Sequence, residues 1–232
     1  MERRHLNHLV VAAPALAWLR LSHAQNLASL SDLDATRGLK AALETGAMAA
    51  VRLLGVENGF LGNPKVRIPL PSGLQEASKL LKALGQGKQV EELEVGINRA
   101  AEGAVPLAKD LLVKAVNTMT VQDAKNILTG GETSVTQFFA GRTREPLTGQ
   151  FLPVVRRVVS RIGLAQKYDR LAGKAAGMGL VKQEDASIDH YVTRKSLDGL
   201  YLIIGEEEKK IRQDPVGTGS AILQKVFGAL KR

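Results

Sequence analysis

Apolar residues recur at intervals of three and four positions along most of this chain, the spacing that places them on one face of an α-helix. The clearest case is the run from Gly87 to Met119, in which Pro106 is expected to kink or restart the helix. No segment alternates between apolar and polar residues for long enough to indicate a β-strand. The pattern predicts an all-α protein, an irregular single-domain bundle of about eight to ten helices.

Capping residues and helix breakers predict the boundaries of the individual helices. The expected helices run over residues 31–54, 72–85, 87–119, 120–130, 193–213 and 219–230. A further helical region is expected to start at Thr143, where Glu145 and Pro146 follow, and to be divided into two helices by Pro153. Gly85 is expected to end the second helix.

The segment from residue 58 to 72 departs from this helical pattern. It contains three prolines, which are Pro64, Pro69 and Pro71. Each proline restricts its own backbone and that of the residue before it, so the segment cannot continue a helix. Val66, Ile68 and Leu70 alternate with Arg67 and a proline. We therefore predict an ordered, extended connector whose apolar side chains pack on the bundle while Arg67 lies on the other side. Such a connector either covers a hydrophobic seam or forms one wall of a ligand groove.

The first 24 residues have the three parts of a secretory signal peptide. A basic start, MERRHLNH, precedes the apolar run LVVAAPALAWLRL, and small residues favour cleavage after Ala24. Arg3 and Arg4 resemble a twin-arginine export signal. The alternative is a membrane anchor, which requires about 20 apolar residues, and this run is shorter. We therefore expect a periplasmic protein in which residues 25–232 form a single helical domain without a transmembrane helix.

The composition of residues 25–232 argues against several kinds of catalytic site. The chain has no cysteine, and the only histidine after Ala24 is His190, so clusters of thiolates or imidazoles for a metal are unavailable. A catalytic triad would depend on His190 alone, and this residue is expected to mark the start of a helix. No nucleotide-binding loop is recognisable. We therefore expect no metal and no cofactor, and we assign no residue a catalytic role.

The run Glu206-Glu207-Glu208-Lys209-Lys210 has the composition of an acidic metal site but not its geometry. Consecutive residues fan around a helix, so the three carboxylates do not converge on one ion. The sequence predicts a solvated helix face in which Glu206 and Lys210 form an ion pair.

Polar residues at the flank of the predicted helices are candidates for a shared network. They are Arg67, Asn98, Arg99, Glu102, Asp123 and Asp198. Polar side chains beside an apolar stripe are either paired inside a core or directed into a cavity. We interpret the set as ion pairs that lock the bundle, in which Arg67, Arg99 or Arg142 binds one of the carboxylates. The alternatives are a ligand groove beside the connector and a hydrolase that uses Glu102 and Asp123.

The positive charge of the chain, +9 overall, is concentrated between Arg142 and Lys182. This segment holds nine basic residues against Glu145 and Asp169, a net charge of +7. Its candidate anionic-surface patch consists of Arg156, Arg157, Arg161, Lys167 and Arg170. Outside the cytoplasm the abundant phosphate-bearing surfaces are phospholipid headgroups and lipopolysaccharide. An aromatic content of 4% argues against binding to nucleic acid. A solvated basic face without a partner is the alternative.

Four motifs follow one another along the chain. They are FLGNPKVRIPLP, LKALGQGKQVEELEVGINRAAEGAVPLAK, MTVQDAKNILTGG followed by QFF, and YVTRKSLDGLYLIIGEEEKKIRQDP. In this order they resemble the proteobacterial family known as domain of unknown function 4197, over residues 33–227. The resemblance implies an export or lipoprotein signal at the start, in agreement with the signal peptide at residues 1–24. Because the chain has no cysteine, it cannot be lipidated as lipoproteins are.

Together these features predict a non-enzymatic binding or interaction protein of the cell envelope. Its expected partner is an anionic or lipidic ligand, such as anionic lipid, or an envelope protein. The sequence does not fix the oligomeric state.

Overall fold

The computed structural model describes residues 32–131, 133–163, 165–169 and 187–214. Its helices are α1 (Asp32–Leu54), α2 (Ser72–Leu81), α3 (Gly87–Ala104), α4 (Lys109–Asn117), α5 (Val121–Thr129), α6 (Ser134–Val159) and α8 (Ile188–Gln213). A π-helical turn, Lys82–Gln86, joins α2 to α3, and a 3-10 turn, Val105–Ala108, joins α3 to α4. The described residues include no β-strand, which confirms the all-α class, but they do not confirm the expected count of eight to ten helices.

Some predictions concern residues beyond this part of the chain. The signal peptide at residues 1–24, the helix at residues 219–230 and Arg170 all lie outside the described residues.

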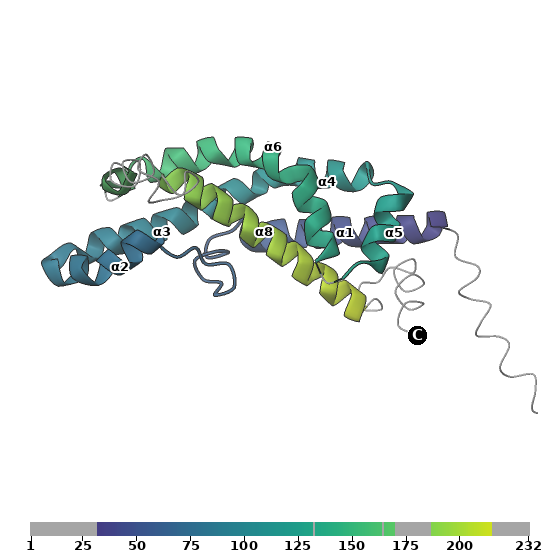
Figure 1. The fold of residues 1–232 in the computed structure, drawn as a ribbon, viewed down its shortest axis with the longest axis horizontal. Coiled ribbons are helices and arrows are strands. Elements are labelled where there is room, and N and C mark those ends of the chain that lie inside the picture. The colour runs from purple at the N-terminus through teal and green to yellow at the C-terminus, as the bar shows by residue number, and fades with distance from the viewer. Residues whose placement is uncertain (1–31, 132, 164, 170–186, 215–232) are drawn as a thin grey trace, which may run out of the picture.

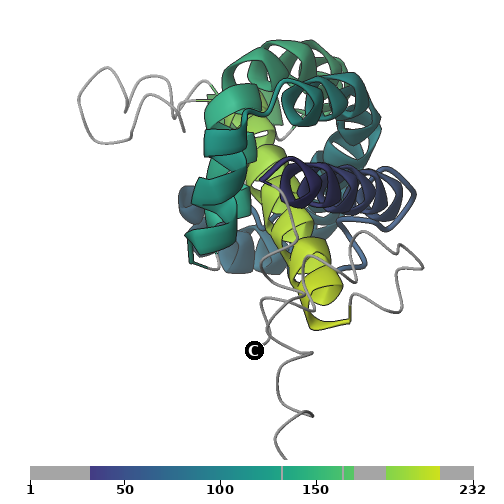
Figure 2. The same ribbon diagram turned by 90° about the vertical axis from the view of Figure 1, so that its right-hand side faces the viewer.

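Helix α8 runs through the middle of the bundle and packs against α6, α1 and α3 (Figure 1, Figure 2). Helices α3 and α4 also pack on α6, and α4 packs on α1. The largest fully buried side chains come from several of these elements and meet in one core: Leu39, Leu43, Leu54, Phe60, Ile68, Leu93, Ile97, Leu112, Phe139, Phe151 and Tyr201. Among the described residues, none of the helices is both long and apolar enough to cross a bilayer.

Several helix boundaries confirm the predictions from local sequence signals. Gly85 adopts a φ of 77°, a left-handed conformation that suits glycine and ends the helical run before α3. Pro106 lies in the 3-10 turn that separates α3 from α4. Helix α5 begins with a capping box, because Thr120 and Asp123 each accept a hydrogen bond from the backbone N–H of the other.

Helix α6 contradicts the expected start at Thr143 and the expected break at Pro153. It is continuous from Ser134 to Val159, with Pro146 and Pro153 inside it. An interior proline costs about 3 kcal/mol, because it removes one backbone hydrogen bond. Both prolines are exposed, whereas the opposite face of α6 is buried in the core and includes Leu147 and Phe151. Burial of each of these side chains contributes about 1.5–3 kcal/mol and offsets that cost.

The start of α8 also differs from the prediction, because the helix begins five residues earlier than expected. Residues 188–192 are helical, and His190 therefore lies in the first turn. The N–H of Ile188 donates to Asp169 Oδ1 at 2.7 Å, so a side chain from another segment satisfies the helix start. Local sequence patterns do not reveal a cap of this kind.

The acidic run in α8 is not the fully solvated face that the sequence predicts. Glu206 pairs with Lys65 of the connector at 2.7 Å, and Lys210 pairs with Glu207 instead of Glu206. Glu208 is buried, with 4% of its surface exposed. The reason is that this part of α8 packs against α1, where Gly46 lies close to Glu207 and Glu208.

The connector between α1 and α2 has the predicted side-chain arrangement but only partly the predicted backbone. Phe60, Val66, Ile68 and Leu70 are buried, whereas Arg67 is exposed, as expected. Residues 57–62 and 64–66 form turns, and the longest stretch of the connector without turn or helix structure is residues 67–71. The positive φ of Asn58, 66°, is one reason that the chain can turn tightly here.

The connector lies over the seam between α3 and α8. A Cβ atom on Gly199 of α8 would lie 2.8 Å from the ring of Phe60 and 3.2 Å from Val66 Cβ. The Tyr191 hydroxyl, also on α8, donates to the carbonyl of Pro69 at 2.9 Å. The absence of a side chain at Gly199 therefore lets the connector approach the α8 backbone.

We predict opposite effects for the same substitution at two helical glycines. Gly199→Ala should lower the free energy of unfolding by about 1–2 kcal/mol, because overpacking against a rigid ring outweighs the gain in helix propensity. Gly149→Ala in α6, where an added Cβ meets nothing within 4 Å, should raise it by about 0.5–1 kcal/mol. Urea denaturation measures both values. Stabilisation by Gly199→Ala would show that the connector does not pack tightly on α8.

Candidate functional site

Asn98 binds the connector as a neighbouring β-strand would. Its Oδ1 accepts from the N–H of Ile68 at 2.8 Å, and its Nδ2 donates to the carbonyl of Ile68 at 3.0 Å. The same Nδ2 donates to the carbonyl of Glu94 at 2.8 Å, one helical turn earlier. Asn98 is fully buried. One side-chain amide therefore satisfies both peptide groups of a residue that has no helical hydrogen bonds.

Glu102, one turn after Asn98 on α3, binds the first half of the connector. Its Oε1 accepts from the N–H groups of Phe60 and Leu61, both at 3.0 Å. Its Oε2 accepts from Arg99 Nη1 at 2.6 Å, and only 5% of the Glu102 side chain is exposed. Both carboxylate oxygens are thus engaged with the protein itself.

Arg99 joins this carboxylate to the start of the connector. Its Nη2 donates to Glu57 Oε1 at 3.1 Å and to Asn58 Oδ1 at 3.0 Å. The hydrogen bond to Glu102 raises the pKa of Arg99 above its ordinary value, and partial burial opposes that rise. The guanidinium remains charged at any physiological pH, so it is a permanent link between α3 and the connector.

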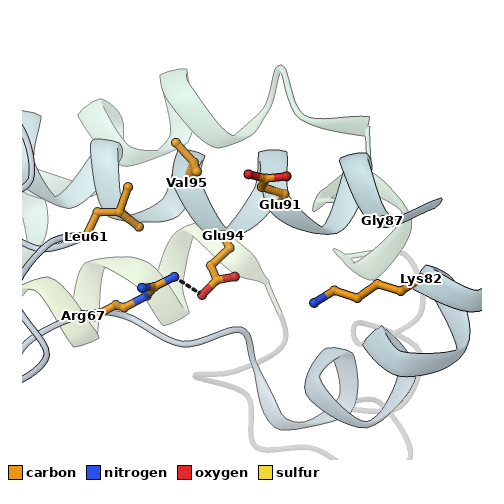
Figure 3. A pocket seen from close by; sticks show the side chains of 7 residues that line it. All are labelled: Leu61, Arg67, Lys82, Gly87, Glu91, Glu94 and Val95. Atoms are coloured by element: carbon orange, nitrogen blue, oxygen red, sulfur yellow. Dashed lines mark hydrogen bonds and ion pairs between the residues drawn. The ribbon is translucent and has the colours of Figure 1, made fainter. Parts of the chain in front are cut away.

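Arg67 lies outside this buried network, at the edge of a surface groove. Its Nη2 binds Glu94 Oε1 at 2.7 Å, and 47% of the Arg67 side chain is exposed. The groove has a volume of about 530 Å³ and is lined by Leu61, Arg67, Lys82, Gly87, Glu91, Glu94 and Val95 (Figure 3). Figure 3 shows Arg67 and Lys82 reaching toward it from two sides, with Glu91 and Glu94 on the helix between them. Two basic and two acidic side chains balance each other, so the groove does not favour one sign of ligand charge.

Asp123 and Asp198 are not part of this network, although the sequence analysis grouped them with it. Arg142 on α6 donates to Asp123 at 2.7 Å, and Arg144 on α6 donates to Asp198 at 2.9 Å. The hydrogen bonds from Thr120 and the charge of Arg142 lower the pKa of Asp123, against the effect of partial burial. The set of six therefore divides into a connector cluster on α3, the exposed pair of Arg67 with Glu94, and two separate pairs made by α6. The connector cluster consists of Asn98, Arg99 and Glu102.

The end of α6 carries the basic residues that the sequence analysis assigned to an anionic-surface patch. Val155, Val159 and Ile162 are buried, and the arginines lie on the exposed side, as the helical spacing predicts. Arg156 donates to Asp189 Oδ2 at 2.7 Å. Arg157, Arg161 and Lys167 are exposed and form no ion pair with a side chain that the structure describes.

A cluster that the sequence analysis missed lies at the start of α8. Ser187 Oγ and the N–H of His190 both donate to Asp189 Oδ1, whose pKa is lowered by these bonds and by Arg156 although burial opposes the shift. Burial raises the pKa of the nearby Asp169, and the negative charge of Asp189 adds to that rise. Across the described ranges, no group of three or more His, Cys, Asp or Glu side chains has the arrangement of a metal site.

Comparison with known proteins identifies one family. The family model described as Protein of unknown function (DUF4197) matches residues 29–228, which confirms the resemblance carried by the four motifs. No curated protein and no solved structure matches the chain.

We predict that the buried amide and the exposed ion pair differ in their contribution to stability. Asn98→Ala should lower the free energy of unfolding by about 2–4 kcal/mol, because it leaves the N–H and carbonyl of Ile68 buried without partners. Arg67→Ala should change it by about 0–1 kcal/mol, the usual range for an exposed ion pair. Urea denaturation of both variants tests this order. An Arg67→Ala loss as large as that of Asn98→Ala would contradict it.

Proposed function

Because this chain belongs to the DUF4197 family of proteins of unknown function, its own surface must indicate its role, and we propose a non-enzymatic cell-envelope protein that binds anionic phospholipid surfaces. The binding residues are Arg157, Arg161 and Lys167, which we call the α6 cationic face. An anionic membrane presents many phosphate charges close together, and these attract exposed basic residues.

The observation that carries this proposal is the difference in pairing among the basic residues of α6 and of the segment that follows it, residues 160–169. Arg142, Arg144 and Arg156 each bind a carboxylate of another element. The α6 cationic face has no such partner among the described side chains, and all its members are exposed. Its positive potential is therefore available to an external partner.

Helix electrostatics account for only part of this arrangement. Cations in the last turn of a helix are stabilised by the partial negative charge of its terminal carbonyls. That effect applies to Arg156 and Arg157, which lie in the last turn of α6. Lys167 lies eight residues beyond Val159, so the macrodipole of α6 gives no reason for its charge.

The connector cluster supports binding over hydrolysis. A hydrolase that used Glu102 as general acid or base would need a carboxylate oxygen within reach of a substrate. Both oxygens of Glu102 are instead bound to backbone amides and to Arg99, in a buried position. Asp123 is likewise bound by Thr120 and Arg142. These carboxylates position the connector and cap α5.

We propose that the protein acts in the periplasm, because its first 24 residues have the pattern of a secretory signal peptide. In that compartment, anionic phospholipid headgroups are the abundant phosphate-bearing surface. This location and the exposed cations together favour a membrane surface over nucleic acid as the partner.

Vesicle sedimentation tests the α6 cationic face. Changing Arg157, Arg161 and Lys167 to Ser should weaken binding to phosphatidylglycerol vesicles on the order of a hundredfold, since each basic residue near an anionic surface contributes about 1 kcal/mol. The matched control changes Arg52, Lys109 and Lys114 to Ser, which removes the same charge from exposed positions on α1 and α4. Control binding should stay close to that of the unchanged chain, and added salt should weaken both. Equal losses in the two variants, or none in either, would contradict the proposal.

Processing of the full-length chain tests the location. Protein recovered from the periplasmic fraction of a Gram-negative host should begin at Gln25 when its N-terminus is sequenced. Changing Arg3 and Arg4 to Lys should stop this export if it follows the twin-arginine route, because that route reads the paired arginines. Recovery of the unprocessed chain from the cytoplasm alone would overturn the location.

A further inference from the structure

Helices α2 and α3 form a hairpin that projects from one end of the bundle (Figure 1). The contacts of α2 are chiefly with α3 and with the π-helical turn that joins them. On α3, Gly96 packs closely against Ile162, which follows α6, because a Cβ atom on Gly96 would lie 2.3 Å from Ile162 Cδ1. The nine residues of α3 before Gly96 extend about 13 Å farther, at a rise of about 1.5 Å per residue.

The tip of this hairpin exposes an apolar side chain. No residue of the turn Lys82–Gln86 is buried. Leu84 lies there with 65% of its surface exposed, the largest fraction among the exposed large apolar residues in the described part of the chain. Gly85 supplies the left-handed conformation that reverses the chain, so the turn does not require a leucine for its geometry. Leu84 is outside the core, so its side chain is free to contact an external apolar phase.

Positive charge surrounds Leu84. Lys79, Lys82 and Lys88 are exposed, and residues 77–90 contain no aspartate or glutamate. None of these lysines forms an ion pair with a described side chain. An exposed leucine among three lysines is the combination that interfacial segments present to anionic membranes, with the apolar group below the headgroups and the ammonium groups at their level.

We propose that the hairpin tip, which consists of Lys79, Lys82, Leu84 and Lys88, inserts Leu84 into the headgroup boundary of an anionic phospholipid membrane. The inference rests on the proposed function for the nature of the surface, but it uses different residues. Charge complementarity selects the partner: the four residues of the tip have a net charge of +3, and the nearest acidic residues in the sequence, Glu76 and Glu91, precede and follow them on α2 and α3. The tip and the end of α6 lie at the same end of the molecule, so one membrane surface can contact both (Figure 1).

A single-cysteine label tests insertion directly, because the chain contains no cysteine of its own. Leu84→Cys, labelled with an environment-sensitive dye, should shift its emission to the blue with phosphatidylglycerol vesicles and not with phosphatidylcholine vesicles. Leu107→Cys is the matched control, since Leu107 is also exposed but lies at the opposite end of α3. An unchanged emission at Leu84, or an equal shift at Leu107, would overturn the proposal. A shift caused by soluble glycerophosphate would also overturn it, because headgroup binding without insertion would then explain the signal.

A second variant separates this proposal from that for the α6 cationic face. Leu84→Ser should weaken vesicle binding on the order of tenfold without changing the melting temperature, because the side chain is outside the core. Leu107→Ser should leave binding unchanged. If Leu84→Ser has no effect while the α6 substitutions abolish binding, the tip proposal is wrong and the α6 proposal stands. If the labelled tip still responds to vesicles at high protein concentration after the α6 substitutions, the tip binds independently.

Discussion

Three residues of the connector, Phe60, Leu61 and Ile68, have backbone groups that are bound by side chains of α3, and the packing of the connector depends on these bonds. Asn98 binds both peptide groups of Ile68, and Glu102 binds two successive N–H groups at Phe60 and Leu61. A buried peptide group that lacks a partner costs about 1–3 kcal/mol, so these bonds decide where the connector can lie. Because Phe60 and Ile68 fill the seam between α3 and α8, the same bonds also determine how closely those helices pack. The surface groove beside Arg67 is a consequence of this packing.

Local signals in the sequence were sufficient to predict the helical class, the kink at Pro106, the cap of α5 and the inward direction of Ile68. Each depends on residues within a few positions of one another. The sequence could not predict the partners of Arg67, Asp198 or Glu206, because these partners, which are Glu94, Arg144 and Lys65, come from other elements. It misjudged α6 for a similar reason: a proline usually ends a helix in isolation, but burial of the opposite face keeps α6 continuous.

The basic residues at the surface fall into two groups. Some form ion pairs within the fold, and the others are exposed without an ion-pair partner among the described side chains. The arginines in the first half of α6 are bound by carboxylates of α5 and α8, and Arg156 is bound at the start of α8. The cations beyond them, and those of the hairpin tip, have no such partner within the described residues. Exposed cations at the end of α6 and at the hairpin tip are suited to contact with an extended anionic surface more than to enclosure of a small ligand.

The long sequence separations of the connector contacts affect the order of folding. The hydrogen bond from Tyr191 to Pro69 spans 122 residues, and that from Lys65 to Glu206 spans 141. Phe60 is therefore without its α8 neighbour during most of translation. Until α8 is made, the apolar side of the connector that faces Gly199 stays uncovered, and uncovered apolar surfaces of nascent chains are prone to self-association. The last regular helix that the structure describes thus completes the cover of the connector, and the native topology closes only after this helix has been made.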